Sequence, residues 1–481
     1  MVVYPSSFLP SFPGRKSVGL GAAVLICSLF IGCQDSGLPP SGNVAGDSGA
    51  GSETTASEAS VPASEEAAAA MDAVAEAYVK LVLELGEHDG DYVDAYYGPA
   101  EWREATGGSG WNVKEIAAQA ETRLTELRAV ELADDVVEIW HLRRRYLERQ
   151  LESLVSRAGL LGGESLSFDQ ESEALYDAVA PLLGAEHFEK TLAVLDEKLA
   201  AQGFPEGTAL ERLEAFREGF IIPTDQVDAV FRTSIDECRK RTAARMDLPE
   251  GESFTVEYVK DKSWSAYNWY QGQYQSLIQV NLDLPIYIDR AVDLACHEGY
   301  PGHHVYNALL EKNLVRDRGW VELSVYPLFS PQSLIAEGSA NYGIEMAFPG
   351  AQRQAFEAEV LYPMLGLDPA KATVYHEIME LTAQLAYAGN EAARGYLDGT
   401  LNAEQAVDWL VNYAAMSRPR AEQRLRFIEK YRSYVINYNL GKDLVRHHVD
   451  TLAGDDSDRR WQVFGELLSS PRLPSGLDGA G

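Results

Sequence analysis

Three histidines and a glutamate are gathered in one short stretch of this chain. Residues 297–304 read HEGYPGHH, and the mostly apolar run AVDLAC precedes them. Catalytic zinc sites take three protein ligands, often histidine and carboxylate, and keep one position open for water. A glutamate beside the first histidine is placed to take a proton from that water. The residue types therefore predict a metal site with hydrolytic chemistry.

The spacing of these residues departs from the usual zinc-protease pattern HExxH, which would need a histidine where the chain has Pro301. His303 lies six residues after His297, and His304 lies seven residues after it. On a straight helix a seven-residue separation amounts to about 10.5 Å, which is too far for two ligands of one zinc ion. Pro301 interrupts the helix and the flanking glycines permit unusual dihedrals. We therefore expect a bulge that returns a later histidine to the metal.

A downstream segment offers the third ligand. IAEGSANYGIE (335–345) places Glu337 on a predicted helix, 34 residues after His303. A glutamate on a second helix is the arrangement of the gluzincin branch of zinc peptidases, and EGSANYGIE is similar to the stretch around the third ligand of zinc aminopeptidases. Upstream, SLIQVNLDLP (276–285) is expected to be the edge strand of the cleft, because such a strand can hold an extended peptide by main-chain hydrogen bonds.

Together, HEGYPGHH and EGSANYGIE resemble the motifs HExxPGHH and EGWAxYxE of the bacterial domain-of-unknown-function 885 family. Members of that family look like zincin-type metallopeptidases and are often secreted lipoproteins. A weaker likeness at YVINYNLG matches the family's PGQAxxYxxG segment at Tyr438 and Gly441. The resemblance covers roughly residues 165–450. Ser339 stands where the family usually has tryptophan, and residues 435–437 replace its Gly-Gln-Ala run.

The resemblance implies a role for each candidate residue. It gives three zinc ligands: His297, His303 and Glu337. His304 is the alternative to His303 as the second histidine ligand. Glu298 would be the general base. Tyr438 would stabilise the oxyanion, as a tyrosine does in related peptidases, and Tyr434 is the alternative for that role.

The elements that must position these residues are mostly helical. Apolar residues recur at three- and four-residue spacing in 65–85, 134–161, 168–200 and 207–246. Alternating and aromatic patterns at about 252–284 predict a small antiparallel sheet, and the active-site helices follow at about 286–313 and 331–348. We therefore predict a mainly α, zincin-like domain of the gluzincin type over residues 66–470, with the sheet bordering the active-site cleft.

The N-terminal segment has the features of a bacterial lipoprotein signal. Arg15 and Lys16 precede an apolar run that ends in LFIGCQ, which is too short to span a bilayer. Residues 1–32 are therefore predicted to be a signal peptide, with a lipid anchor on Cys33 that holds the protein at the cell envelope, facing the periplasm or on the outer membrane. An ordinary signal peptide with an incidental cysteine is the alternative. Residues 33–65 contain no aromatic residue and predict a disordered tether.

The composition of the chain limits the partners that it can bind and bears on the state of its cysteines. The chain has 73 Asp and Glu against 41 Lys and Arg, a formal net charge of −32. This balance argues against a nucleic acid as partner, because binding its backbone needs clustered lysine and arginine. Cys238 and Cys296 are expected to be two buried thiols, although a disulfide between them is possible in an oxidising compartment.

The residues and the resemblance together predict an exported, lipid-anchored, zinc-dependent metallopeptidase. Its substrate would be a peptide or a small amide. Two alternatives stay open: a zinc hydrolase of a non-peptide amide or ester, and a non-catalytic binding lipoprotein.

Overall fold

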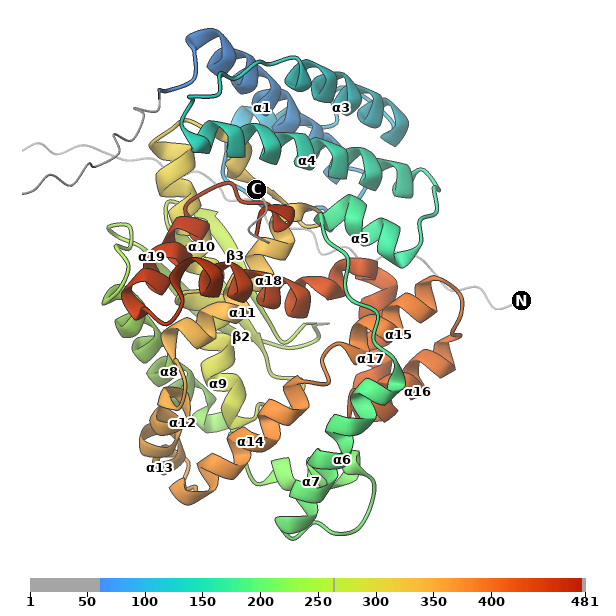
Figure 1. Cartoon of the computed structure of the whole chain (residues 1–481), viewed down its shortest axis with the longest axis vertical. Coiled ribbons are helices and arrows are strands. Elements are labelled where there is room, and N and C mark those ends of the chain that lie inside the picture. The colour runs from blue at the N-terminus through green and yellow to red at the C-terminus, as the bar shows by residue number, and fades with distance from the viewer. Residues whose placement is uncertain (1–60, 263, 478–481) are drawn as a thin grey trace, which may run out of the picture. The chain divides into compact units, whose positions relative to one another are not determined.

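The computed structural model describes residues 61–262 and 264–477 (Figure 1). The predicted signal peptide, the lipid anchor on Cys33 and most of the predicted tether lie outside these residues. The tether was expected to reach residue 65, but the folded part begins earlier. Val61 pairs with the segment before α4 through hydrogen bonds with Asp135 and Val137, and the Ser64 side chain accepts the Ala67 N–H at the start of α1.

The described part is mainly α-helical, as predicted. The helices of its first half are α1 (Glu65–Gly86), α2 (Ala100–Glu104), α3 (Val113–Arg128), α4 (Glu138–Leu161), α5 (Phe168–Tyr176), α6 (Ala185–Ala201), α7 (Ala209–Glu218) and α8 (Val227–Ala243). The later helices are α9 (Ile288–Leu294), α10 (His303–Leu310), α11 (Pro331–Ala347), α12 (Gln352–Phe356), α13 (Tyr362–Met364), α14 (Ala372–Ala383), α15 (Ala388–Leu397), α16 (Ala403–Tyr413), α17 (Arg418–Tyr431), α18 (Ile436–Ala453) and α19 (Ser457–Leu468). No helix among the described residues has both the length and the apolar character needed to cross a bilayer.

Two of the predicted helical segments each contain two helices. Between α5 and α6 the chain carries Pro181 and Gly184, and between α7 and α8 it carries Gly219 and Pro223. Proline lacks the N–H that a helix interior needs, so each pair of residues ends one helix before the next begins. At the other end of the chain the predicted boundary at residue 470 is too early, because Leu477 is fully buried in the core.

The predicted sheet is present, but it is mixed rather than antiparallel. It contains β2 (Ser253–Val259), β3 (Ala266–Gly272) and β4 (Gln275–Asn281) in the order β2-β4-β3. A tight turn folds β4 antiparallel onto β3, and β2 pairs in parallel with the other side of β4. The segment expected to be the edge strand is therefore the central strand, since both of its edges are paired. Its alternation is as predicted, with Ile278 and Val280 buried.

A second, two-stranded sheet joins distant parts of the chain. β1 (Val93–Tyr96) pairs antiparallel with β5 (Val325–Pro327), with Ala95 opposite Tyr326. β5 lies just before α11, the helix that carries Glu337. The pairing therefore brings the tyrosine-rich stretch around β1 to the start of the glutamate helix. The N-terminal helices α1, α3 and α4 pack on one another beside it (blue to teal in Figure 1).

Helices α11 and α18 cross at two glycines. A Cβ atom on Gly338 would lie 2.4 Å from the backbone of Gly441, and one on Gly441 would lie 2.7 Å from the Leu334 carbonyl oxygen. These distances are shorter than any side chain permits, so the two backbones touch only because both residues are glycine. The contact sets α18 close along the helix that carries Glu337.

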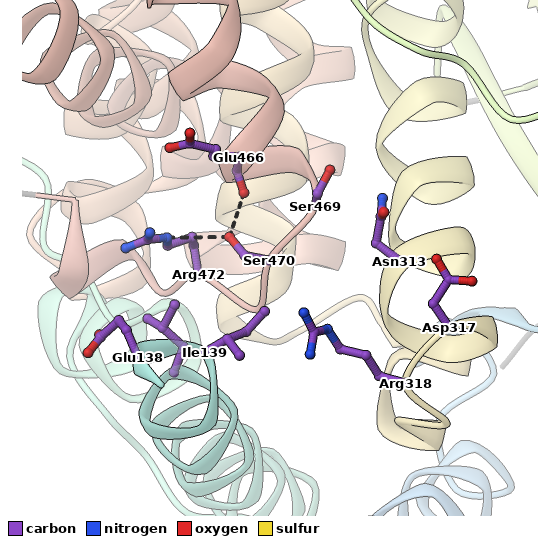
Figure 2. Close-up of a pocket in the computed structure, with 10 residues that line it drawn as sticks. Glu138, Ile139, Asn313, Asp317, Arg318, Glu466, Ser469, Ser470 and Arg472 are labelled. Atoms are coloured by element: carbon purple, nitrogen blue, oxygen red, sulfur yellow. Dashed lines mark hydrogen bonds between the residues drawn. The ribbon is translucent and has the colours of Figure 1, made fainter. Parts of the chain in front are cut away.

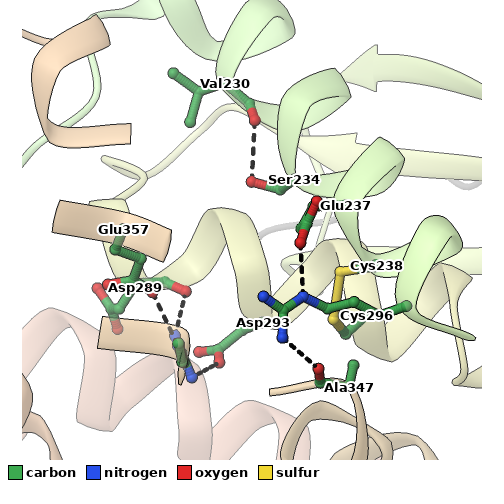
Figure 3. The surroundings of a disulfide bond; sticks show 11 residues. Val230, Ser234, Glu237, Cys238, Asp289, Asp293, Cys296, Ala347 and Glu357 are labelled. Carbon is green, nitrogen blue, oxygen red and sulfur yellow. Dashed lines mark hydrogen bonds and ion pairs between the residues drawn. A yellow bond between two sulfur atoms is a disulfide. The ribbon is translucent and has the colours of Figure 1, made fainter. Parts of the chain in front are cut away.

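The expectation of two free thiols is wrong, because Cys238 and Cys296 form a disulfide (Figure 3). Both residues are fully buried, as expected. Helix α8 packs against the turn that contains Cys296, which sets the two Cα atoms 5.7 Å apart, within the range that a disulfide spans. The bond ties α8 to the residue directly before His297.

Removing the disulfide should destabilise the fold. The two cysteines are 58 residues apart in sequence. Closing a loop of that length lowers the conformational entropy of the unfolded chain and so raises its free energy by about 4 kcal/mol. We expect the Cys238→Ala/Cys296→Ala variant to lower the free energy of unfolding by about this amount, measured by urea denaturation. A midpoint that does not move, either in this variant or on adding reductant to the wild type, would show that the bond does not constrain the chain.

Candidate metal centre

The stretch HEGYPGHH contains the predicted break. Helix α9 passes into a π-helical turn, Ala295–Gly299, and α10 starts at His303. Neither Gly299 nor Gly302 has a left-handed φ, but Gly302 has the unusual dihedrals φ −80° and ψ −136° directly before α10. Gly302 is required for another reason: a Cβ atom there would lie 1.8 Å from the His297 carbonyl oxygen. Its N–H donates to the Cys296 carbonyl at 3.0 Å, which closes the loop.

This loop brings His297 and His303 to the carboxylate of Glu337 on α11. The two histidine Nε2 atoms are 3.1 Å apart, and they lie 3.3 and 3.7 Å from Glu337 Oε2. Ligand atoms around a tetrahedral zinc ion at 2.0–2.1 Å are separated by about 3.3 Å. The three atoms thus have the spacing of one face of a zinc coordination tetrahedron, and these three residues could hold a metal ion.

The polar atoms of the cluster also fit a metal. Glu337 Oε2 is buried and has no hydrogen-bond partner among the described residues, although both histidines lie near it. Glu337 Oε1 is held in place by the Tyr434 hydroxyl, which donates to it at 2.9 Å. An unpartnered buried carboxylate oxygen is costly unless a cation faces it. Two imidazole nitrogens and a carboxylate oxygen are a donor set that suits zinc.

The contacts in the metal-free cluster shift the pKa values of its residues. Burial lowers the pKa of His303, but the carboxylates of Glu337, Glu298 and Asp94 more than compensate and raise it to about 9. Burial by itself would raise the pKa of Glu337, yet the close approach of His297 and His303 holds it well below its usual range. In the metal-free cluster these shifts favour a protonated His303 beside an ionised Glu337.

His304, the alternative ligand, lies outside this cluster. Its ring is fully buried and faces the sheet, with Nδ1 2.9 Å from Ser276 Oγ and Nε2 2.9 Å from Glu252 Oε2. Both ring nitrogens are therefore occupied. The same glutamate accepts hydrogen bonds from Tyr300 and Arg239. This network fastens the first turn of α10 to β4 and to Glu252, the residue directly before β2.

Glu298, the predicted general base, lies beside the metal cluster. Its side chain is buried, and its carboxylate has no hydrogen bond or ion pair with any described residue. Its backbone carbonyl accepts the Asn268 side-chain N–H at 2.7 Å, so β3 holds the turn from the sheet side. Burial raises the pKa of Glu298, Glu337 adds to the rise, and His297 and His303 oppose it.

The two candidate tyrosines have different environments. Tyr434 is bound to Glu337, as described above, whereas the Tyr438 hydroxyl has no hydrogen bond with the described residues. The two rings lie 5.8 Å apart, edge to face. Burial, together with the charges of Glu337 and Glu298, raises the pKa of Tyr438 well above its usual value. Its hydroxyl is therefore protonated at neutral pH and free to donate.

Sequence reasoning missed one acidic residue at this site, Asp94. It lies on β1, and burial raises the pKa of its carboxyl to about 7, with His303 lowering it and Glu337 and Glu298 raising it further. These neighbours place Asp94 against the metal cluster. The signal in the sequence is a single acid within the aromatic stretch YVDAYYGP (92–99), and aromatic residues in such a stretch commonly pack in a core.

A surface cavity lies elsewhere in the molecule (Figure 2). It has a volume of about 660 Å³ and is bounded by the start of α4, the segment after α10 and the end of α19. Its polar lining is mixed in charge, with Glu138, Arg318 and Arg472 among the residues. None of the candidate metal ligands lines this cavity.

Comparisons with known proteins give fold likenesses at low identity. No model of a known protein family matches the chain, and no curated protein matches it. Among solved structures it is similar to a candidate lipoprotein from Colwellia psychrerythraea (17% identity, TM-score 0.48, 76% of this chain and 68% of that chain). It is also similar to a candidate lipoprotein of unknown function from Shewanella oneidensis (14%, 0.44, 79% and 75%) and to a Pyrococcus furiosus carboxypeptidase (13%, 0.42, 83% and 89%). At these TM-scores the likenesses carry no argument about activity.

Metal content should show which of the adjacent residues His303 and His304 is a zinc ligand. We expect His303→Ala to lose zinc, because it removes one of the three converging atoms. His304→Ala should keep about one zinc per chain and lose about 1–3 kcal/mol of unfolding free energy, because Glu252 and Ser276 lose a buried partner. Elemental analysis and urea denaturation measure the two effects. Zinc retained by a folded His303→Ala protein would rule out this ligand set.

The stability of the metal-free protein should fall as the pH rises. The folded-state pKa of His303, about 9, lies above its unfolded value near 6.5, so its contribution is fully present below the unfolded pKa and is lost as the pH rises through the folded pKa. Between pH 7 and pH 9.5 the loss is about 2 kcal/mol. Urea denaturation of the chelator-treated wild type, compared with His303→Gln at each pH, measures it. If the unfolding free energies of the two proteins depend equally on pH, the effect does not come from His303.

Proposed function

We propose that this chain is a zinc-dependent hydrolase that cleaves peptide bonds. The observation that carries the proposal is the convergence of His297, His303 and Glu337 beside an unpaired buried carboxylate, Glu298. When bound by the three ligands, zinc supplies a Lewis acid that activates water and polarises a carbonyl group. The resemblance of the two motifs to predicted zincin-type peptidases supports the choice of a peptide substrate.

Glu298 is the proposed general base. Its burial raises its pKa toward the range in which a carboxylate can both accept and return a proton. It takes a proton from the attacking water and delivers it to the leaving amine as the peptide bond breaks. No other described side chain competes for its oxygens by a hydrogen bond or an ion pair.

Tyr438 is the proposed donor to the oxyanion. Its hydroxyl stays protonated because burial and two nearby carboxylates raise its pKa, and a fixed donor in a dry site stabilises negative charge that develops in the transition state. Tyr434 has a different part, since it already holds Glu337 Oε1 in place. Asp94 adds negative charge beside His303 and so favours a bound cation.

We further propose that the protein is exported and anchored through Cys33. The basic residues, the apolar run and the Gly32-Cys33 junction of the first 33 residues support this. The Cys238–Cys296 disulfide supports it from the folded part, because such bonds persist in oxidising compartments.

Replacing the proposed base tests the function. Glu298→Gln should bind zinc as the wild type does and should lose about 10²- to 10⁴-fold in kcat for peptide hydrolysis, because no group remains to take the proton. Mixed peptide libraries, followed by mass spectrometry with and without a chelator, measure the activity.

Glu359→Gln provides the matched control, because Glu359 is an exposed glutamate outside the site. It should leave kcat unchanged. Undiminished hydrolysis in Glu298→Gln would remove Glu298 from the mechanism. Hydrolysis of small amides or esters without any peptide cleavage would favour the non-peptide alternative.

A further inference from the structure

Helix α17 carries an arginine that lacks an acidic partner. Arg424 forms no ion pair and no hydrogen bond with the described residues, and its Nε atom is buried without a partner. Acids outnumber bases in this chain by 73 to 41. Its neighbours on the same helix, Arg418 and Lys430, are paired with Asp408 and Asp91. The partly buried guanidinium of Arg424 therefore lacks the anion that these two neighbours have.

Aromatic rings form the immediate surroundings of Arg424. Its Cζ atom lies 4.8 Å from the ring centroid of Phe427 and 5.9 Å from that of Tyr438. Burial lowers the pKa of the guanidinium, and among the described groups Tyr438 alone opposes this. Cation–π contacts orient such a group, but they give no acceptor to its N–H donors, of which Nε–H is buried. The rings explain where the guanidinium lies and not what it binds.

Tyr438 connects Arg424 to the metal cluster. Its ring lies 5.9 Å from the Arg424 Cζ atom and 5.8 Å from the ring of Tyr434, whose hydroxyl donates to Glu337 Oε1. Arg424 is thus connected to the metal cluster through two tyrosines, on the side of the proposed oxyanion donor.

A second unpaired arginine lies one helical turn earlier. Arg420 also has no ion pair or hydrogen bond with the described residues, and burial lowers its pKa. Residues four apart project from the same face of a helix. This face of α17 therefore carries two partly buried arginines without an acidic partner among the described residues.

We propose that Arg424 binds the C-terminal carboxylate of the substrate, so that the enzyme removes residues from the C-terminal end of peptides. The guanidinium fork matches a carboxylate bidentately, and a carboxylate supplies the missing negative charge. One residue spans at most about 3.6 Å, so a carboxylate one or two residues beyond the scissile bond would extend past the metal cluster toward Arg424. This inference rests on the proposed function and adds its substrate class.

Paired substrates test the proposal. Zinc-loaded protein is assayed with peptides that differ only at the C terminus, which is either a free carboxylate or an amide. The wild type should favour the carboxylate by about 10- to 100-fold in kcat/KM, the effect of a hydrogen-bonded charge. Arg424→Gln should lose this preference by lowering kcat/KM for the free acid alone, and Arg424→Lys should keep part of it.

Arg426→Gln is the matched control, because Arg426 is exposed on the same helix; it should behave as the wild type does. Equal cleavage of acid and amide by the wild type would overturn the proposal while leaving the peptidase function intact. A preference that survives in Arg424→Gln would overturn it too, since the carboxylate would then be bound elsewhere, including by the metal.

A binding measurement separates this proposal from the proposed function. Calorimetry with N-acetylphenylalanine and its amide, on zinc-loaded wild type and Arg424→Gln, needs no turnover. If no peptide is cleaved but the acid binds better than the amide only when Arg424 is present, the peptidase function fails and the carboxylate site stands. If acid and amide bind alike to the wild type, the carboxylate site fails.

Discussion

The close approach of Gly302 to the carbonyl oxygens of Cys296 and His297 is the contact on which the candidate site depends. It allows the chain to leave one helix and begin another within three residues, so that His303 returns to His297. A side chain at residue 302 would clash with both carbonyl oxygens and force the two segments apart. Neighbouring elements hold both halves of the loop: the disulfide fixes the entry through α8, and the buried His304 fixes the exit to the sheet.

Segments from distant parts of the sequence converge on this loop. The glycine contact between α11 and α18 sets Tyr434 and Tyr438 beside Glu337, and the pairing of β1 with β5 delivers Asp94. The charges have a consistent arrangement. Carboxylates gather around the candidate metal ligands, whereas the guanidinium of Arg424 lies against the ring of Tyr438. The proposed substrate, a peptide with a free C terminus, would place its carbonyl at the metal and its carboxylate at the arginine.

Where the parts of this arrangement lie close together in the sequence, the sequence alone predicted them. HEGYPGHH and EGSANYGIE indicated the three converging residues, because ligand types and a helix break are local properties. The order of the strands could not be predicted, since alternation within β4 does not say how many of its edges are paired. The disulfide was missed because burial of Cys238 and Cys296 is compatible with thiols until the packing of α8 is known. Asp94 and Arg424 are single residues in segments dominated by aromatic or charged neighbours, and only tertiary contacts distinguish them.

The most direct test of the account is the position of the metal itself. Crystals of zinc-loaded protein, measured on both sides of the zinc absorption edge, show where the ion lies. The account predicts one anomalous peak about 2.0–2.2 Å from Nε2 of His297, Nε2 of His303 and the carboxylate of Glu337, with the His304 ring still bound to Glu252 and Ser276. A peak coordinated by His304, or no peak among these three residues at full zinc loading, would contradict it.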